Sequence, residues 1–248
     1  MMIIAITGTN TDVGKTIATA ALAAELSHRG HHVDIIKPIQ TGEAEGAGDI
    51  YTIEQLTGIK GHELIRYPEP LAPNLAARRA AMPMLTAHEV AQRIGEFHDR
   101  AVAQHAGTAK LPPVVLVEGA GGLLVRINEQ ENFADVVRLL GCGLIVVTSL
   151  GLGSLNAAEL TVEAANARGI DVFGIIGGSI SSKPDLATTL NLEELPRITK
   201  RPFFGALPEG LGGNADSHEY DSHASQARLR GHVDLAELFA HIDKESTD

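Results

Sequence analysis

The sequence GTNTDVGKT, residues 8–16, decides the fold. An apolar run, Met2 to Ile6, precedes it, and the helix-forming stretch IATAALAAEL, Ile17 to Leu26, follows it. A strand, a glycine-bearing loop and Gly-Lys-Thr at a helix start form the P-loop arrangement. In this arrangement, backbone N–H groups and the helix dipole bind phosphate. The Lys contacts the terminal phosphates, and the Thr hydroxyl binds a magnesium ion. The spacer between the two loop glycines is one residue longer than in the common loop. The stretch therefore predicts a nucleotide-binding loop of a sub-class with one extra residue, in preference to a glycine-rich turn before an ordinary helix.

The composition excludes several classes of protein. The chain has 248 residues, of which 44% are hydrophobic and 21% charged, so we expect a folded domain with a sizeable core. Acidic residues outnumber Lys and Arg by 31 to 20, and the formal net charge of -11 argues against nucleic acid as the main partner. An anionic ligand must then be held by local groups.

Two further features bear on the compartment. Cys142, the single cysteine, lies in the apolar run GCGLIVV and is expected to be a buried structural thiol, so no disulfide can form within the chain. Met1 leads directly into a strand, with no basic start and no long apolar segment. This pattern predicts neither a signal peptide nor a membrane span, and we expect a cytoplasmic protein with no membrane partner.

Apolar runs alternate with helical patterns along the chain. Strands are expected at residues 2–6, 32–36, 113–117, 144–148, 172–176 and 203–206, and helices at 15–29, 50–57, 88–105, 155–168, 186–195 and 233–242. Strands that are apolar throughout are buried on both faces. The prediction is one α/β domain over residues 1–248, a P-loop NTPase-like, mostly parallel sheet with helices on both faces. The polar stretch at about 210–230 is expected to be a mobile loop.

Charged side chains follow two of the predicted strands. In an open parallel sheet, ligands bind beyond the carboxyl ends of the strands. Lys37 follows the second apolar strand and is stiffened by Pro38, which suits it to meet an anion. Glu118 follows the third strand and precedes the small residues Gly119 to Gly122, where P-loop enzymes keep a metal-binding acid. Asp49 is either a second magnesium carboxylate or the N-cap of the next helix.

A second helix start offers another anion site. The strand that ends at Thr148 leads through the segment GLGS, residues 151–154, into a helix that bears Asn156. The N–H groups of such a start can hold a carboxylate or a phosphate, with ordinary helix capping as the alternative. Among the eleven histidines, the segment HEYDSH at 218–223 is one residue too long for the zinc-protease pattern, so no zinc site is expected.

Several motifs together resemble one family. GTNTDVGKT, KPIQTG, VEGAGGLLV, NFADVV and LGSLNAAELTVEA follow one another from Ile3 to Gly178, and GALPEG at 205–210 adds a weaker match. In this order they are similar to the ATP-dependent dethiobiotin synthetases of biotin synthesis. The combination is far more specific than any one motif. The resemblance implies a P-loop α/β fold, a homodimer and a requirement for magnesium.

The resemblance also implies a reaction. Dethiobiotin synthetases convert diaminopelargonate, carbon dioxide and ATP to dethiobiotin, ADP and phosphate. One amine takes up carbon dioxide to form a carbamate, and the carbamate attacks the γ-phosphate to give a carbamic-phosphoric anhydride. The second amine then closes the ureido ring and expels phosphate. Such chemistry needs positioning and charge neutralisation more than a strong base.

Residue by residue, the resemblance implies roles for positions in this chain. The expected catalytic residues are Lys37, Lys15 and Thr11. The expected nucleotide contacts are Asp12, Val13, Gly14, Lys15, Thr16, Ile17, Gly178, Ser179, Pro208 and Glu209. The expected magnesium ligands are Thr16, Asp49 and Glu118. The diamine is expected to contact Asp12, Lys37, Thr41, Gly119, Ala120 and Gly121. Its distal carboxylate is expected at the helix start of the partner subunit, which comprises Gly153, Ser154, Leu155 and Asn156.

The chain departs from the family where the base binds. Many members have an Asn after the strand that here reads VFGII, and its side chain bonds the adenine edge, whereas this chain has Gly178. Glycine offers the base only backbone, so we expect ATP or another nucleoside triphosphate as co-substrate.

A partitioning-type ATPase, a nucleotide switch that binds membranes or DNA, is the alternative function. Such proteins carry a second Lys early in the P-loop, where this chain has Thr9, and the acidic C-terminal stretch from His232 lacks a basic amphipathic pattern.

Overall fold

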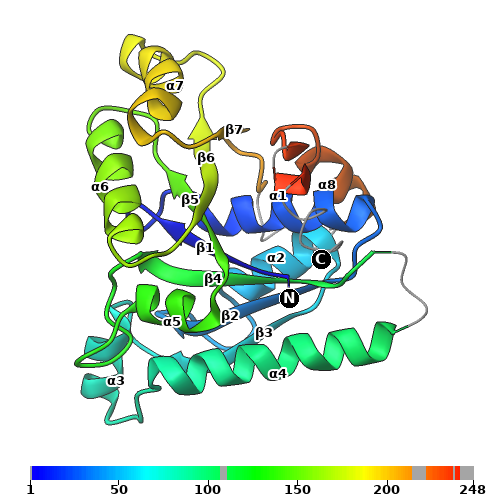
Figure 1. Cartoon of the computed structure of the whole chain (residues 1–248), viewed down its shortest axis with the longest axis vertical. Helices are drawn as coiled ribbons and strands as arrows, with labels where there is room; N and C mark the ends of the chain where they lie inside the picture. The colour runs from blue at the N-terminus through cyan, green and yellow to red at the C-terminus, as the bar shows by residue number, and fades with distance from the viewer. Residues whose placement is uncertain (1, 107–110, 214–221, 237, 241–248) are drawn as a thin grey trace.

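Seven strands form one sheet in the computed structural model, which describes residues 2–106, 111–213, 222–236 and 238–240. Every pairing between these strands is parallel, and their order is β3-β2-β4-β1-β5-β6-β7 (Figure 1). The strands are β1 (Ile3–Gly8), β2 (Val33–Thr41), β3 (Gly61–Tyr67), β4 (Val114–Gly122), β5 (Gly143–Thr148), β6 (Val172–Ile180) and β7 (Phe203–Pro208). β1, which leads into the P-loop, therefore lies at the centre.

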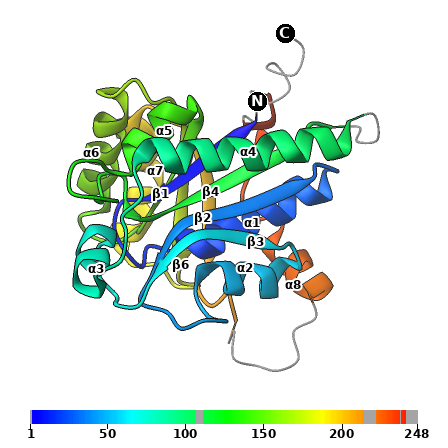
Figure 2. The same cartoon turned by 90° about the horizontal axis from the view of Figure 1, so that it is seen from below.

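Helices cover both faces of this sheet. Figure 2 shows α4 and α5 on one side of the strands and α1, α2 and α8 on the other. The helices are α1 (Lys15–His28), α2 (Asp49–Thr57), α3 (Pro73–Ala80), α4 (Ala87–His105), α5 (Phe133–Leu140), α6 (Ser154–Asn166), α7 (Leu186–Thr199) and α8 (Ser222–Leu229). The predicted α/β fold with helices on both faces is confirmed.

Two buried clusters follow from the alternation of side chains along the strands. In β1, Ile4 and Ile6 join the cluster under α1 and α2, whereas Ile3 and Ala5 join the cluster under α4 and α5. Successive strand residues point to opposite faces, so a continuous apolar strand contributes to both clusters. Helix α1 packs closely because its buried face consists mostly of alanines. The central strands and α1 together fix the frame that carries the P-loop.

Most predicted elements are confirmed, and four of the described elements were not predicted. All six predicted strands are present, as are the predicted helices at 15–29, 50–57, 88–105, 155–168 and 186–195. Strand β3 and helices α3 and α5 were not predicted. Part of the stretch 210–230, expected to be a loop, is helix α8, while residues 214–221 lie outside the described part of the chain. Of the last predicted helix, residues 236 and 238–240 are helical.

The environment of Cys142 agrees with a structural thiol. Cys142 lies half-buried just before β5, and burial raises the pKa of its thiol to about 12. The thiol is therefore protonated at neutral pH and a poor nucleophile. In the part of the chain that the structure describes, no helix is long and apolar enough to cross a membrane.

Candidate active site

The P-loop is held between β1, α1 and β6. Asp12 and Gly14 adopt left-handed backbone with φ of 57° and 93°, which lets the loop turn back onto the start of α1. A Cβ on Gly14 would lie 2.4 Å from the carbonyl oxygen of Gly178, and one on Gly178 would lie 1.6 Å from that of Val13. Only glycines permit this approach, so the end of β6 forms a wall of the loop. The Lys15 ammonium donates to the Asn10 carbonyl at 3.1 Å.

Four side chains from different elements meet beside this loop. The Lys37 Nζ lies 2.5 Å from Asp49 Oδ2 and 3.0 Å from Glu118 Oε1. The Thr16 hydroxyl lies 2.7 Å from Asp49 Oδ1 and 3.2 Å from Glu118 Oε1. These groups come from β2, α2, β4 and α1, which the sheet order brings together. Burial is deep, since Lys37 is 3% exposed and Glu118 0%.

The charges of this cluster depend on one another. Burial alone would lower the pKa of Lys37, but the nearby carboxylates of Glu118 and Asp49 outweigh it and raise that pKa above its usual value. For Lys15, burial and then the positive charge of Lys37 lower the pKa. Burial would raise the pKa of Asp49, yet the ammonium of Lys37 holds it below its ordinary range. At neutral pH the cluster therefore contains a charged Lys37 and an ionised Asp49.

Lys37 and Glu118 lie inside their strands, which corrects the expectation that they follow them. β2 continues to Thr41 because it still pairs with β3, although its pairing with β4 stops at Ile36. Pro38 lies just beyond that point, where its missing N–H costs no bond to β4. Glu118 is paired in register with Ile6 of β1, and β4 runs on through the glycines. Both charged side chains therefore belong to residues within the strands of the sheet.

The structure excludes one of the two interpretations of Asp49. Gly48 is the N-cap of α2, and Asp49 is the first helical residue. Its carboxylate contacts Lys37 and Thr16, and its backbone N–H donates to Gln40 Oε1 at 3.2 Å. The N-cap alternative is wrong, and the carboxylate belongs to the cluster.

The donor set of Thr16, Asp49 and Glu118 fits magnesium. A hydroxyl and two carboxylates converge within hydrogen-bond distance, and Mg²⁺ prefers such hard oxygen ligands, usually one or two carboxylates plus phosphates and water. Among the described residues, no group of three or more His, Cys, Asp or Glu side chains is suited to hold a metal. The segment HEYDSH lies in residues 218–223, whose side chains fall outside the described part of the chain.

Thr11, predicted to be catalytic, and the other predicted diamine contacts on this subunit lie at the same edge of the sheet. Thr11 and Asp12 are exposed in the P-loop, and Thr41 is half-buried at the end of β2. A Cβ on Gly121, whose φ is 64°, would lie 3.5 Å from the Thr11 hydroxyl. The end of β4 thus approaches the P-loop closely from the side opposite Gly178.

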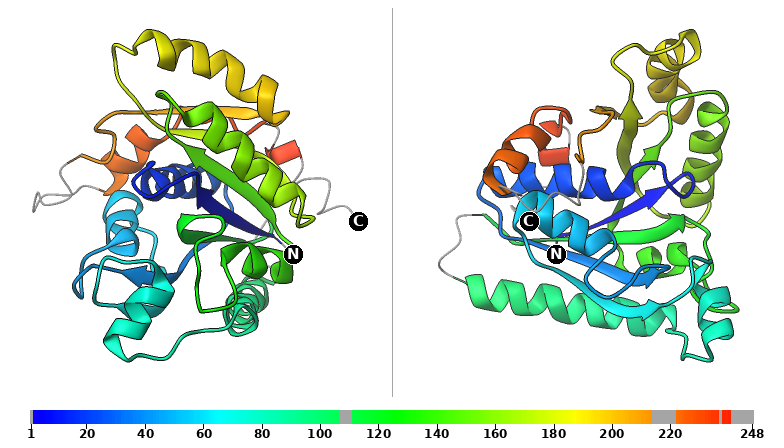
Figure 3. Two further views of the ribbon diagram at one scale, coloured as in Figure 1. Left: turned by 90° about the vertical axis from the view of Figure 1, so that its left-hand side faces the viewer. Right: turned by 180° about the vertical axis from the view of Figure 1, so that it is seen from behind.

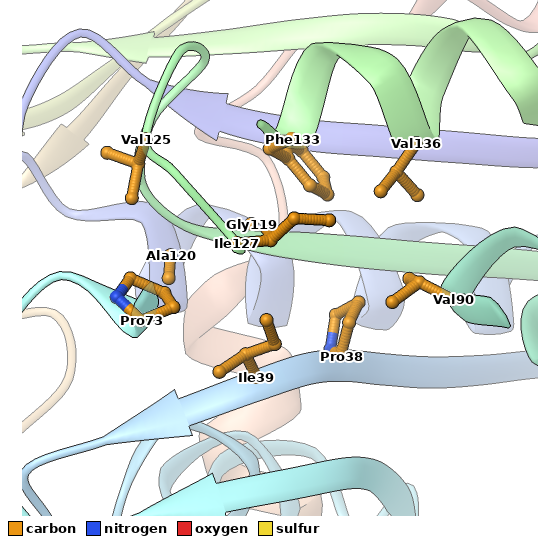
Figure 4. A pocket seen from close by; sticks show the side chains of 10 residues that line it. All are labelled: Pro38, Ile39, Pro73, Val90, Gly119, Ala120, Val125, Ile127, Phe133 and Val136. Carbon is orange, nitrogen blue, oxygen red and sulfur yellow. The ribbon is translucent and has the colours of Figure 1, made fainter. Parts of the chain in front are cut away.

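A narrow apolar pocket lies beneath Gly119 and Ala120. Figure 4 shows the lining side chains directed toward one another from β2, α3, α4, β4 and α5 and from the loop after β4; the lining residues are Pro38, Ile39, Pro73, Val90, Gly119, Ala120, Val125, Ile127, Phe133 and Val136. Its volume of about 10 Å³ is at the lower limit for a single water molecule. In this structure the pocket is therefore a closely packed apolar support for the end of β4.

The predicted base contacts gather at the ends of β6 and β7. Ser179 is exposed at the end of β6, and the Glu209 N–H donates to the Ile180 carbonyl at 2.8 Å. Beyond Pro208, a Cβ on Gly212 would lie 2.7 Å from Ile17 Cδ1. Ile17 of α1 and the segment after β7 therefore lie against each other near the P-loop wall.

The second helix start lies at the beginning of α6. Gly153 is its N-cap with φ of 85°, Ser154 is buried, Leu155 is half-buried and Asn156 is exposed. Asn191 of α7 donates from Nδ2 to the Leu150 and Gly151 carbonyls, both at 2.9 Å, and to Ser154 Oγ at 3.1 Å. This amide fixes the loop before α6.

Three residues that support the candidate site were not predicted from the sequence. Gln40 bonds the start of α2, Asn191 holds the loop before α6, and the Thr19 hydroxyl donates to Glu118 Oε2 at 2.7 Å. Each acts through a tertiary contact. The one available signal was that Thr19 lies one helical turn beyond Lys15, on the same face of α1.

The fold and this cluster define a P-loop nucleotide-binding protein, and the comparisons give the family. The AAA domain family matches residues 3–211. The ATP-dependent dethiobiotin synthetase BioD of Corynebacterium efficiens is 53% identical over 214 residues, which cover 86% of this chain and 91% of that protein. The protein of the same name from Saccharopolyspora erythraea is 47% identical over 216 residues, with 86% and 90% covered. The chain belongs to the ATP-dependent dethiobiotin synthetases, a family of enzymes.

Solved structures agree on the fold alone. The MinC:MinD cell division protein complex of Aquifex aeolicus has a TM-score of 0.54 at 14% identity, with 92% of this chain and 94% of that chain covered. Chloroplast FtsY from Physcomitrella patens has a TM-score of 0.51 at 19% identity, and this chain spans 65% of it. At such identities the likeness carries no statement about activity.

Proposed function

We propose that the protein closes the ureido ring of dethiobiotin from 7,8-diaminopelargonate, carbon dioxide and a nucleoside triphosphate. The observation that carries this proposal is the cluster beside the P-loop, in which Lys37, Asp49, Glu118 and Thr16 meet within 2.5 to 3.2 Å. The relatives named ATP-dependent dethiobiotin synthetase support the choice of substrates.

The residues present suit phosphoryl transfer from the nucleotide to a carbamate. The P-loop N–H groups and Lys15 bind the triphosphate, and Lys37 neutralises charge on the carbamate and the transferred phosphoryl group. Thr11 and Thr41 orient the carbamate by hydrogen bonds, while Asp12 accepts from the diamine. Thr16, Asp49 and Glu118 would hold magnesium, which would neutralise negative charge on the phosphates. The second amine then attacks the carbamic carbon, the bond from that carbon to the phosphate oxygen breaks, and phosphate leaves.

Exposed leucines support a homodimer with a shared site. Leu152 before α6 is 93% exposed, Leu160 of α6 56%, and Leu186 and Leu190 of α7 75% and 51%. Figure 3 shows α6 and α7 side by side at this edge of the molecule. Covering such apolar side chains removes them from water, which favours association. A partner on this surface would lie next to the start of α6, where the distal carboxylate of its own diamine would bind.

Phosphate release tests the proposal. We expect release from ATP to depend on both diaminopelargonate and bicarbonate, because the carbamate is the acceptor. Omitting either should reduce the rate to background. A partitioning-type ATPase would release phosphate at the same rate in all mixtures, and that result would refute the proposed reaction.

Glu118→Gln should raise the magnesium requirement with the fold intact. The amide keeps the shape of the carboxylate but binds Mg²⁺ poorly, since a charged ligand is lost. We expect the magnesium concentration for half-maximal rate to rise about tenfold or more, equivalent to about 1.4 kcal/mol. An unchanged magnesium titration would show that Glu118 is no ligand.

The nucleotide base should matter little to the rate. Gly178 presents only backbone, and the Val13 carbonyl occupies the space that any side chain there would need. A bidentate side-chain contact to a base is worth about 1 to 3 kcal/mol, so its loss should lower base selectivity by about one to two decades. CTP, GTP and UTP should support turnover within about tenfold of ATP. Initial rates at equal magnesium measure this, and strict dependence on ATP would point to Ser179 or the backbone near Pro208 as a substitute contact.

A further inference from the structure

Gln40 links β2 to the carboxylate cluster without contributing a charge. The residue is 4% exposed, and its side-chain Oε1 accepts from the backbone N–H of Asp49 at 3.2 Å. Its Nε2 donates to the Thr41 carbonyl at 3.1 Å, which fixes the orientation of the amide. The amide thus bonds the first residue of α2 to the strand that carries Lys37.

The start of α2 lacks the usual support. Its N-cap, Gly48, has no side chain to accept from the first N–H groups, and its φ of 106° suits only glycine. A Cβ at Gly48 would lie 3.0 Å from Gln40 Cδ, so the glycine makes room for the amide. Gln40 therefore replaces, from another element, the side-chain cap that α2 does not have.

The segment between β2 and α2 is held from its outer side as well. Arg66 of the edge strand β3 donates to the carbonyls of Glu43, Ala44 and Ala47 at 3.0, 2.6 and 2.9 Å. Glu63 orients the guanidinium through contacts of 2.6 and 2.9 Å. The Gln40 amide holds the inner end of this segment, at Asp49, and Arg66 holds its middle.

We propose that Gln40 is a positioning residue, which sets the Asp49 carboxylate as a metal ligand, and that Arg66 assists it by holding the segment that leads to Asp49. The inference rests on the proposed function in one respect, the assignment of Asp49 to magnesium. A carboxylate on a first helical turn moves with the backbone of that turn. Freeing the N–H of Asp49 therefore displaces the carboxylate from Thr16 and Glu118.

Binding of Mn²⁺ in the presence of ADP, followed by electron paramagnetic resonance, tests the role without the diamine. Gln40→Met keeps the volume but removes both hydrogen bonds, and it should weaken Mn²⁺ binding about fivefold to tenfold, equivalent to about 1 to 1.4 kcal/mol. Gln92→Met on the exposed face of α4 is the matched control and should bind Mn²⁺ normally. At saturating Mg²⁺, Gln40→Met should recover most of its turnover.

A double-mutant cycle separates positioning from general destabilisation. In an Asp49→Asn background, Gln40→Met should weaken Mn²⁺ binding no further, because the ligand that it positions is already gone. Arg66→Met should weaken Mn²⁺ binding in the same way. If Gln40→Met fails to fold, the Arg66→Met variant provides the test instead. Normal Mn²⁺ binding in the folded variants, or full additivity with Asp49→Asn, would overturn the positioning role. Normal binding in Asp49→Asn alone would instead overturn the metal assignment in the proposed function.

Discussion

Replacing Lys37 with alanine should lower turnover by at least about a hundredfold, the scale of losing one preorganised electrostatic contact. The Lys37 ammonium is buried, charged and bound to Asp49 and Glu118 beside the P-loop. No solvent molecule can supply an equivalent fixed charge to the transferred phosphoryl group. Affinity for the nucleotide should fall less, because the P-loop and Lys15 remain.

Steady-state rates at saturating magnesium measure the effect. Saturating metal matters because the loss of Lys37 leaves two carboxylates without their counter-charge, which is costly in a buried site. Lys183→Ala, at an exposed position, is the control and should be unaffected. Thermal unfolding of both variants checks the fold. Near-normal turnover in a folded Lys37→Ala enzyme would refute its role in the reaction.

Mixed dimers should recover activity that neither parent variant has. Lys15→Ala removes the P-loop ammonium, and Asn156→Asp places a negative charge where the distal carboxylate of the diamine is proposed to bind. Asn156 is exposed in the first turn of α6, where an acidic residue suits the helix dipole, so folding should be preserved. If each site uses both subunits, one mixed dimer contains one intact site.

Random pairing in an equal mixture should restore about a quarter of the wild-type rate, since about half of the dimers are mixed and each has one working site. The assay is run at a low diamine concentration, where the Asn156→Asp defect is greatest. The two parent dimers, assayed separately, are the controls. Verified mixed dimers without recovered activity would show that each subunit builds its site alone.

The fold was predictable where strands are buried on both faces, because such strands have continuous apolar sequences. β1, β4 and β5 lie inside the sheet and are apolar on both faces, so their sequences show it. β3 is an edge strand with six half-buried residues, and its sequence GHELIRY has no apolar run. α5 is an eight-residue helix, too short for its periodicity to stand out from sequence alone. Edge position and shortness account for these two omissions.

The candidate site was predictable in its charged residues and not in their supports. Lys37 and Glu118 interrupt apolar strands, and a charge in such a place is conspicuous. Gln40 and Asn191 are ordinary polar residues in the sequence, and their roles arise only because separate elements meet. Spacing alone left the N-cap role of Asp49 open, and the position of Gly48 as the N-cap of α2 excludes it.

Isotope transfer from bicarbonate to phosphate tests the central claim most directly, namely that a carbamate oxygen attacks the γ-phosphate. Carbon dioxide labelled with ¹⁸O gives a carbamate with two labelled oxygens, one of which becomes the bridge to phosphorus. When the second amine closes the ring, that oxygen leaves with the phosphate and the other stays in the ureido carbonyl. Short incubations limit exchange of label with water. We predict one ¹⁸O in each released phosphate and one in each dethiobiotin, and phosphate without label would contradict the account.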